Sequence, residues 1–440
     1  MEKTLDRKLA EIHADPSGST AFVLADAKDA DMAFGVSSFG RSAEAEERGE
    51  PFRTVEEYRA EIRELVAQAA VDIMLMSAST NDRLAYGERL FDDSSVTPAA
   101  RANDASDIFA IRGGRYVEQP SRPFRTATID DIQCGRVECA AEERATGTNL
   151  GLYSITFNNR LDEDLASLEA YRRFRVEAEQ KGFRHFLEVF DPNAAANLET
   201  SEVPRFVNDA VVRTLAGVPR AGRPLFLKMV YHGPKATEEL VAYDPHLIVG
   251  ILGGSAGTTY DAFKLLAEAQ KYGARVALFG RKINNAECQP AFVRFLRLIV
   301  EGEISAEEAV RAYHGVLAKL GVRPRRSLED DLQLQTAVMS YRSGSAAVPK
   351  SVPQSLPTRG TTEGGAAADG EKKKPGCGCG GDAKTGCGCK GKKHAAGQES
   401  GAKETPTDAV AGGEPDFAAM TTAEKLAYQQ AKRDRIFGRY

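Results

Sequence analysis

Short apolar runs alternate along the chain with longer segments in which apolar residues recur every three or four positions. Over roughly the first 330 residues, this alternation is typical of βα units around a parallel sheet. The runs that have the length of buried strands are Ala21–Ala25, Val71–Met76, Asp107–Arg112, Leu150–Phe157, His185–Phe190, Pro224–Val230, Leu247–Leu252 and Val276–Phe279. Because eight such strands favour a closed cylinder over an open sheet, the pattern predicts an α/β fold, a (β/α)8 TIM barrel over residues 1–342.

Two polar segments interrupt this alternation. Arg41–Thr54 is a charged stretch after the first strand, and Val117–Gly147 is a long polar stretch between the third and fourth strands. Each segment is compatible with a lid over the active end of the barrel or with surface decoration, and the sequence leaves both interpretations open.

The composition changes in the last quarter of the chain. From Ser343 to Gly370 the sequence is rich in Gly, Ala, Ser, Thr and Pro, which is typical of a flexible linker. We expect a disordered tail over residues 343–415 and a short helix over 416–440. Apolar residues of this helix recur at three- and four-residue steps, so it could dock onto a scaffold or onto the shell of a bacterial microcompartment. A solvated helix face is the alternative.

Four cysteines of the tail form two Cys-Gly-Cys pairs, Cys377 with Cys379 and Cys387 with Cys389. Four thiolates can bind zinc tetrahedrally, although paired zinc ligands usually have two to four residues between them. The closer spacing suits another soft metal or a redox pair better. A low-complexity tract with incidental thiols is the alternative.

Charge and composition argue against several classes of partner. The net charge of −5 offers no global field for nucleic acid or for an anionic membrane. No apolar run approaches the roughly 20 residues that span a bilayer, and the N-terminus lacks the apolar stretch of a signal peptide. We therefore expect a cytoplasmic protein. The cysteines outside the tail are scattered, so we expect no disulfide framework in the barrel: Cys134, Cys139 and Cys288.

A single cation, Lys228, interrupts the apolar run of the sixth strand just before a Tyr-His-Gly turn. Burying an ammonium group without a partner is costly, so a lysine in this position is paired, neutral or reactive. A desolvated lysine is the amine that attacks carbonyl groups to form a Schiff base. A strand-end lysine that reaches solvent is the alternative.

Other polar residues follow the predicted strands at the end where barrel enzymes place their catalytic groups. Asp26 and Lys28 follow the first strand, and Glu188 lies on the fifth. The seventh strand is followed by a glycine-rich turn, and the eighth by Gly280 and Arg281. Glycines let backbone N–H groups approach an anion, and an arginine adds a bidentate cation, so these two loops predict a phosphate site. A tight turn with a surface arginine is the alternative.

The stretch from about Gly182 to Arg281 resembles the class I aldolases of the tagatose-bisphosphate and archaeal fructose-bisphosphate type, relatives of deoxyribose-phosphate aldolase. The resemblance covers the second half of the barrel well and the first half poorly. The segments that carry it are Phe186-Leu187-Glu188, Leu227-Lys228, Gly253-Gly254-Ser255-Ala256-Gly257, Gly273-Ala274, Gly280-Arg281 and, on the first strand, Ala25-Asp26-Ala27-Lys28.

The resemblance implies a role for each matching residue. Lys228 would form the Schiff base, and Glu188 would move protons during carbinolamine formation and carbon–carbon cleavage. Asp26 and Lys28 would bind or polarise substrate hydroxyl groups. The residues that would hold a phosphate are Gly253, Gly254, Ser255, Gly280 and Arg281. A salt bridge that keeps Lys228 charged and inert is the alternative for Glu188.

The chain also departs from the family. Some relatives carry a second lysine on a middle strand, but Leu152–Asn159 has none, which leaves Tyr153 as a candidate acid or as a core residue. The seventh strand lacks the lysine that deoxyribose-phosphate aldolases place beside the Schiff base, which argues against that specificity.

These observations together favour a cytoplasmic class I aldolase, a carbon–carbon lyase acting on a phosphorylated sugar. We expect a homo-oligomer that needs no metal or cofactor for catalysis and binds neither nucleic acid nor membrane. One alternative is a non-catalytic barrel that binds a phosphorylated metabolite and has a metal- or scaffold-binding tail. Another is a different barrel lyase or isomerase in which Lys228 is a base.

Overall fold

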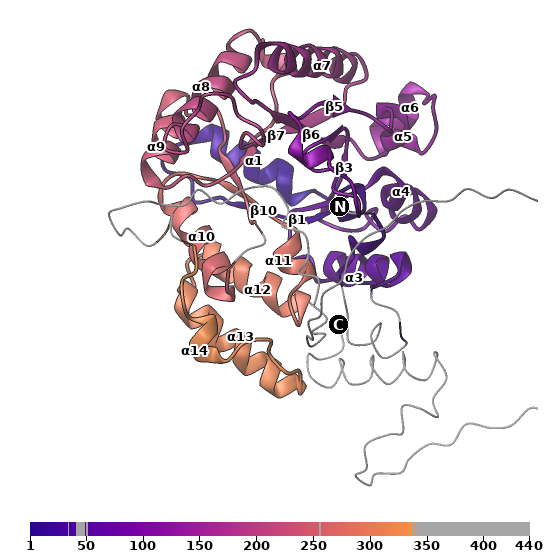
Figure 1. Cartoon of the computed structure of the whole chain (residues 1–440). Coiled ribbons are helices and arrows are strands. Elements are labelled where there is room, and N and C mark those ends of the chain that lie inside the picture. The colour runs from indigo at the N-terminus through magenta and orange to yellow at the C-terminus, as the bar shows by residue number, and fades with distance from the viewer. Residues whose placement is uncertain (34, 41–48, 50–51, 255–256, 337–338, 340–440) are drawn as a thin grey trace, which may run out of the picture. The chain divides into compact units, whose positions relative to one another are not determined.

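The computed structural model describes residues 1–33, 35–40, 49, 52–254, 257–336 and 339, and Figure 1 shows them as coloured ribbon. They all belong to one compact unit, Met1–Arg359. The expected tail, its cysteine pairs and its terminal helix lie outside the described residues, as does most of the charged stretch Arg41–Thr54.

Eight parallel strands close into a barrel, which confirms the predicted fold class. In order around the barrel they are β1 (Val23–Lys28), β10 (Val276–Phe279), β9 (Gly250–Leu252), β8 (Leu227–Met229), β7 (Arg184–Phe190), β6 (Leu150–Thr156), β3 (Thr97–Arg101) and β2 (Ile73–Met76). Sequential strands are neighbours, as expected when each strand is joined to the next by a right-handed crossover.

Helices surround this barrel, with α7, α8 and α9 along one side and α10, α12 and α13 along another (Figure 1). The helices of ten or more residues are α1 (Thr4–Ala14), α3 (Val55–Gln68), α7 (Leu161–Gln180), α8 (Val203–Ala216), α9 (Pro234–Tyr243), α10 (Thr259–Lys271), α12 (Gln289–Val300) and α13 (Ala306–Leu320). The shorter ones are α4 (Ala78–Asn81), α5 (Ile129–Cys134), α6 (Ala141–Thr146), α11 (Arg281–Asn284) and α14 (Leu328–Asp331). The local sequence determines where some of these helices begin. For example, Thr258 caps α10 in a capping box with Asp261.

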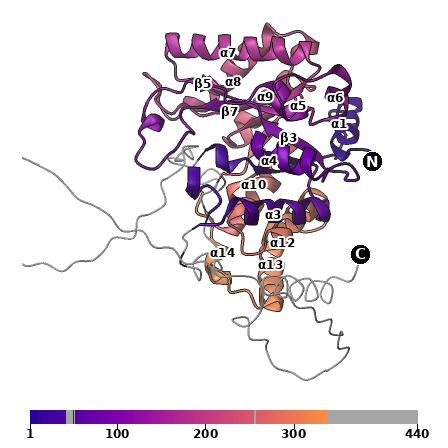
Figure 2. The same ribbon diagram turned by 90° about the vertical axis from the view of Figure 1, so that its right-hand side faces the viewer.

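The interior of the barrel is filled by alternate residues of the strands, such as Val23 and Ala25 of β1. The residues between them face outward and pack under the helices, as Leu24 does. Helix α1 adds Leu5, Leu9 and Ile12 to the interior cluster and so covers the N-terminal ends of the strands. Figure 2 shows this indigo helix on one side of the barrel. The open end is therefore the C-terminal one, where barrel enzymes place their sites.

The third strand differs from the sequence-based prediction. Asp107–Arg112 was expected to form it, but Thr97–Arg101 does, and Asp107–Arg112 lies in the turns and loop that follow. The strand reads Thr-Pro-Ala-Ala-Arg, and neither Pro98 nor alanine favours a strand. Pairing with β2 on one side and β6 on the other overrides that weak local preference.

The polar stretch Val117–Gly147 has structure of its own rather than forming a bare loop. It contains β5 (Pro123–Phe124), which pairs with β4 (Asp104–Ala105), and the short helices α5 and α6. Gln133 of α5 donates to Asn149 Oδ1 and to the carbonyl oxygen of Lys181, so α5 packs near the N-terminal ends of β6 and β7, and Arg144 of α6 contacts Asp130 of α5. Their placement favours the decoration interpretation for this part of the insertion.

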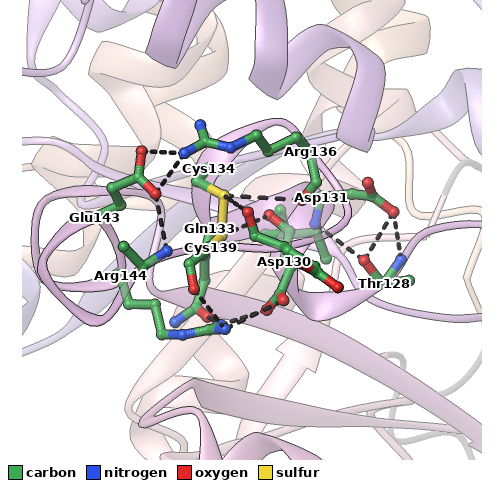
Figure 3. Close-up of a disulfide and its surroundings, with 12 residues drawn as sticks. Thr128, Asp130, Asp131, Gln133, Cys134, Arg136, Cys139, Glu143 and Arg144 are labelled. Carbon is green, nitrogen blue, oxygen red and sulfur yellow. Dashed lines mark hydrogen bonds and ion pairs between the residues drawn. A yellow bond between two sulfur atoms is a disulfide. The ribbon is translucent and has the colours of Figure 1, made fainter.

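A disulfide joins Cys134 at the end of α5 to Cys139 just before α6, with the Cα atoms 6.0 Å apart. This link was not predicted from the scattered cysteines; it is local and joins residues only five positions apart. Figure 3 shows Arg144 reaching beneath it toward Asp130 and the carbonyl oxygen of Cys139. Cys288 is a free thiol.

No helix in the described part of the chain combines the length and the apolar character needed to cross a membrane.

Removing the disulfide should have a modest effect on stability. The loop between Cys134 and Cys139 is short, so its closure restricts the unfolded chain by about 2 kcal/mol. We expect the double substitution Cys134→Ser/Cys139→Ser to lower the free energy of unfolding in urea by no more than that. Adding a reductant to the double variant is the control, since any remaining effect must then come from other cysteines. A loss well beyond this value would mean that the disulfide holds native structure beyond its own loop.

Candidate active site

A buried ion pair lies at the C-terminal ends of two neighbouring strands. Lys228 of β8 and Glu188 of β7 are register partners, and Lys228 Nζ lies 2.5 Å from Glu188 Oε1. Lys228 is 6% exposed and Glu188 is 2% exposed. Both side chains point into the barrel because Phe226 and Phe186, which lie two positions earlier in the chain, belong to the interior cluster. The predicted pairing of these two residues is therefore the arrangement that the structure holds.

The second carboxylate oxygen of Glu188 is held from two sides. Ser154 of β6 donates its hydroxyl to Oε2 at 2.6 Å, and Arg101 of β3 approaches the same oxygen with Nη2 at 3.3 Å. Burial would raise the pKa of Glu188, but Lys228 and Arg101 together hold it below its ordinary value. Glu188 is therefore a carboxylate at neutral pH.

Arg101 is itself fixed by Asp29, which follows β1. Its Nε donates to Asp29 Oδ2 at 2.6 Å and its Nη1 to Ser154 Oγ at 2.9 Å. Burial would lower the pKa of Arg101, but Asp29 and Glu188 outweigh that effect and raise it. Four buried charges thus form a chain, Asp29–Arg101–Glu188–Lys228, in which each charge touches one of opposite sign.

Two further carboxyl groups lie near this chain. Asp107 accepts hydrogen bonds from Thr156 Oγ1 at 2.7 Å and from Ser121 Oγ at 2.9 Å, and burial raises its pKa. Burial raises the pKa of Asp104 to about 6, although Arg101 opposes the shift. Neither Asp104 nor Asp107 was singled out in the sequence, because both belong to the segment misassigned around the third strand.

The predicted phosphate loops meet at the ends of β9 and β10. Arg281 begins α11, and burial lowers its pKa while Glu188 opposes the shift. Its guanidinium makes no hydrogen bond or ion pair with any residue that the structure describes. Lys282 beside it donates to the carbonyl oxygens of Gly257 and Thr258 at 2.7 and 3.0 Å, which fixes one loop to the other.

Glycine is required at three of the predicted phosphate positions. Gly254 has a φ of +60°, and a Cβ on Gly280 would lie 2.7 Å from the carbonyl oxygen of Ala27. Gly253 is also tight, since its Cβ would meet the ring of Phe279 at 2.2 Å. Ser255 lies outside the described residues. Of the four predicted residues that the structure describes, Arg281 is thus the one whose side chain can bind a ligand.

Asp26 and Lys28 do not reach this site. Ala27 takes the inward position on β1, so its two neighbours face outward beneath α3 and α12. Lys28 Nζ donates to Gln289 Oε1 at 2.6 Å and lies 3.8 Å from Asp26 Oδ2 and 3.9 Å from Glu61 Oε2. The residue of this segment that does join the buried charges is Asp29.

Tyr153 also lies on the outer face of its strand. Its ring packs against Tyr171 and Phe174 of α7, with centroids 5.1 and 4.5 Å apart. Ser154, the next residue, takes the inward position and contacts Glu188. Tyr153 is therefore a core residue, the second of the two interpretations that the sequence left open. Among the described residues no group of His, Cys, Asp and Glu side chains is arranged to hold a metal ion.

The chain of charges suits proton transfer between an amine and a carboxylate. Because Lys228 Nζ and Glu188 Oε1 are 2.5 Å apart, a proton can transfer between them with little movement of either group. Arg101 and Ser154 hold the other oxygen of Glu188 still, so the carboxylate presents Oε1 to the amine. Arg281, which has no ion-pair partner among the described residues, adds a cation that can bind an anionic group of a ligand.

No protein-family model matches this chain, and no curated protein matches it in sequence. Among solved structures, it is similar to a fructose-bisphosphate aldolase from Slackia heliotrinireducens, with 12% identity and a TM-score of 0.51 over 70% of this chain and 91% of the other. An archaeal fructose 1,6-bisphosphate aldolase gives 14% identity and a TM-score of 0.48 over 67% and 99%. Identities this low show a shared fold and nothing finer. The chain thus shares its fold with a protein that is named as a fructose-bisphosphate aldolase.

The outward carboxyl group of Asp26 should make stability depend on pH. It is fully buried, neither oxygen accepts a hydrogen bond from a described residue, and burial raises its pKa to about 7. The native state therefore binds a proton more tightly than the unfolded chain, so this group's contribution to stability falls as pH rises from about 4 to about 7. We expect Asp26→Asn to remove a slope of up to about 1.4 kcal/mol per pH unit from urea-unfolding measurements in that window. The control is Asp93→Asn at an exposed aspartate, and identical pH profiles for all three proteins would contradict the prediction.

Proposed function

We propose that this protein is a class I aldolase that cleaves or forms a carbon–carbon bond in a phosphorylated sugar through a Schiff base on Lys228. The observation that carries the proposal is the buried Lys228–Glu188 pair at the open end of the barrel. A reactive amine needs a nearby group that can take and return its proton, and Glu188 Oε1 lies within reach to do both.

The first half of the reaction forms the Schiff base. Glu188 takes a proton from Lys228, and the neutral Nζ attacks the carbonyl carbon of the sugar. The proton on Glu188 passes to the carbonyl oxygen, and the nitrogen then returns a proton to Glu188, which leaves a neutral carbinolamine. Glu188 protonates the departing hydroxyl, water leaves, and the product is an iminium ion beside a carboxylate again.

The second half breaks the carbon–carbon bond. A base removes the proton from the hydroxyl two carbons from the iminium carbon, and Glu188 is the carboxylate in place for this step. The bond between the hydroxyl-bearing carbon and the carbon next to the iminium carbon breaks, its electron pair moves toward the iminium to give an enamine, and the hydroxyl-bearing fragment departs as an aldehyde. Protonation of the enamine carbon and addition of water then release the second product and restore Lys228.

Arg281 supports the phosphorylated class of substrate. Its guanidinium is free among the described residues and senses the charge of Glu188, so an anion bound there would lie at the same end of the barrel as the amine. The closely packed glycines Gly253 and Gly280 bring backbone close to the same region. The likeness to the Slackia enzyme, which is named for fructose bisphosphate, makes a bisphosphorylated ketose one candidate.

A non-catalytic barrel that binds a phosphorylated metabolite is the second candidate. The observation that favours it is the same short contact, because a lysine paired so closely with a carboxylate can remain a charged and inert salt bridge. In that case Arg281 would still bind the phosphate, and Lys228 would form no covalent adduct.

The remaining sequence-based expectations stay predictions. The proposed chemistry calls on no metal or cofactor, and a soft metal such as zinc would bind the tail cysteines Cys377, Cys379, Cys387 and Cys389. Three further predictions remain from the sequence: a cytoplasmic location, a homo-oligomeric state, and docking of residues 416–440 to a scaffold or microcompartment shell.

Reduction with borohydride in the presence of candidate sugars tests the Schiff base. We expect a covalent adduct on the peptide that contains Lys228 when the panel includes ketose and aldose phosphates, and none in Lys228→Met. The fold of this variant should survive, because Arg101 still pairs with Glu188 after the amine is removed. Lys235→Met, at an exposed lysine of α9, is the matched control and should be trapped as the wild type is. Turnover retained in Lys228→Met would rule out the assignment, and a wild type that traps nothing across the panel would favour the binding protein.

The role of Arg281 can be separated from that of the amine. We expect Arg281→Ala to weaken binding of phosphorylated ligands roughly 10-fold or more, since hydrogen bonds to a charged group contribute about 1.5–3 kcal/mol. Unphosphorylated analogues should bind almost unchanged. Arg294→Ala, at an exposed arginine of α12, is the control. Equal losses for both ligand classes in calorimetry would show that Arg281 does not recognise phosphate.

A further inference from the structure

Two arginines lie near Glu188, and their surroundings differ in kind. Arg281 keeps its donors free among the described residues. Arg101 uses its fork on three different partners: Nε on Asp29 at 2.6 Å, Nη1 on Ser154 at 2.9 Å and Nη2 on Glu188 at 3.3 Å. Because every nitrogen of this guanidinium already has a partner in the protein, Arg101 is poorly placed to bind a substrate. Its role is to hold other side chains.

Two of the contacts of Arg101, those with Glu188 and with Ser154, act on the same atom, Glu188 Oε2. Oε2 of Glu188 receives Arg101 directly, and it also receives the hydroxyl of Ser154, which Arg101 orients from the other side. Asp29 in turn fixes the guanidinium, and all four side chains are buried. The carboxylate can therefore rotate only by breaking several charge-assisted contacts at once, and its other oxygen stays directed at Lys228 Nζ.

We propose that Arg101 is a positioning residue, which fixes the orientation and the negative charge of Glu188 so that Oε1 always faces the amine of Lys228. The expected effect on turnover rests on the proposed function. The expected effect on the charge of Glu188 rests on the geometry alone. Without Arg101, Glu188 would keep Lys228 as its one ion-pair partner among the described residues, and each time Lys228 became neutral the carboxylate would have no cation in contact with it. Arg101 supplies a permanent counter-charge because a guanidinium does not lose its proton.

The electrostatic consequence can be measured without any substrate. In protein labelled with ¹³C at the glutamate carboxyl carbon, the resonance that disappears in Glu188→Gln identifies Glu188. We expect the titration midpoint of that resonance to rise in Arg101→Met, because one of the two cations that lower the pKa of Glu188 is gone. Arg101→Lys keeps a positive charge and should leave the midpoint closer to the wild-type value. Arg281→Ala is the matched control and should move it less than Arg101→Met does. An unchanged midpoint in folded Arg101→Met would overturn the proposal.

The positioning consequence is measured in turnover with the substrate that traps on Lys228. We expect Arg101→Met and Arg101→Lys both to lower kcat, Arg101→Met by roughly 10²-fold, the scale on which a misplaced acid–base group acts. KM should change much less, and the acidic limb of the pH–rate profile should move to higher pH only in Arg101→Met. Ser154→Ala should produce a smaller loss in kcat because it removes one of the two contacts on Oε2.

These outcomes distinguish a failure of the inference from a failure of the proposed function. A wild type that forms no adduct refutes the aldolase, while the carboxyl titration still decides whether Arg101 controls Glu188. If Arg101→Met does not fold, Arg101→Lys decides: wild-type kcat in the folded lysine variant would refute the positioning role. A lowered kcat with an unaltered midpoint in that variant supports it, since the charge remains and only the fork is lost.

Discussion

Four charges lie buried side by side in this barrel, and none of them could be buried alone. Removing an isolated carboxylate or ammonium from water costs several kcal/mol, and only a close opposite charge with good geometry offsets that cost. Here each charge has such a neighbour: Asp29 meets Arg101, Arg101 meets Glu188, and Glu188 meets Lys228. The four residues come from β3, β7, β8 and the position just after β1, so the arrangement exists only when the barrel has closed.

Closure of the barrel also explains why a second group of charges lies so near and yet serves a different purpose. Asp26 and Lys28 flank Ala27 on the same strand that leads to Asp29, but the alternation of side chains sends them to the helix layer. There Lys28 meets Gln289 and approaches Glu61, and Asp26 is left without a hydrogen-bond donor among the described residues. One strand thus contributes to two buried polar groups that face opposite ways. In the inner group each charge contacts an opposite charge. In the outer group the carboxyl group of Asp26 has a raised pKa.

The sequence predicted the barrel because seven of its eight strands have apolar runs strong enough to recognise. The third strand was missed, since Pro98 and two alanines carry no local strand signal and only pairing with its neighbours defines it. Arg101 was missed with it. Lys228 and Glu188 were found because a charge inside an apolar run is visible in the sequence itself. Asp26 and Lys28 were assigned to the wrong face of β1. Side chains alternate between the two faces of a strand, so counting in steps of two from the inward Ala25 selects Ala27. The link between Cys134 and Cys139 depends on a turn whose shape no periodicity reveals.

Helix α1 has a consequence for the order of events at the open end. By packing Leu5, Leu9 and Ile12 against the N-terminal ends of the strands, it closes that end of the barrel and leaves the C-terminal end as the side from which a ligand can approach Lys228. In the proposed reaction, the substrate and the water that hydrolyses the adduct would therefore enter from the same side. The fragment bound covalently to Lys228 would leave after the free aldehyde, because its release waits for that water.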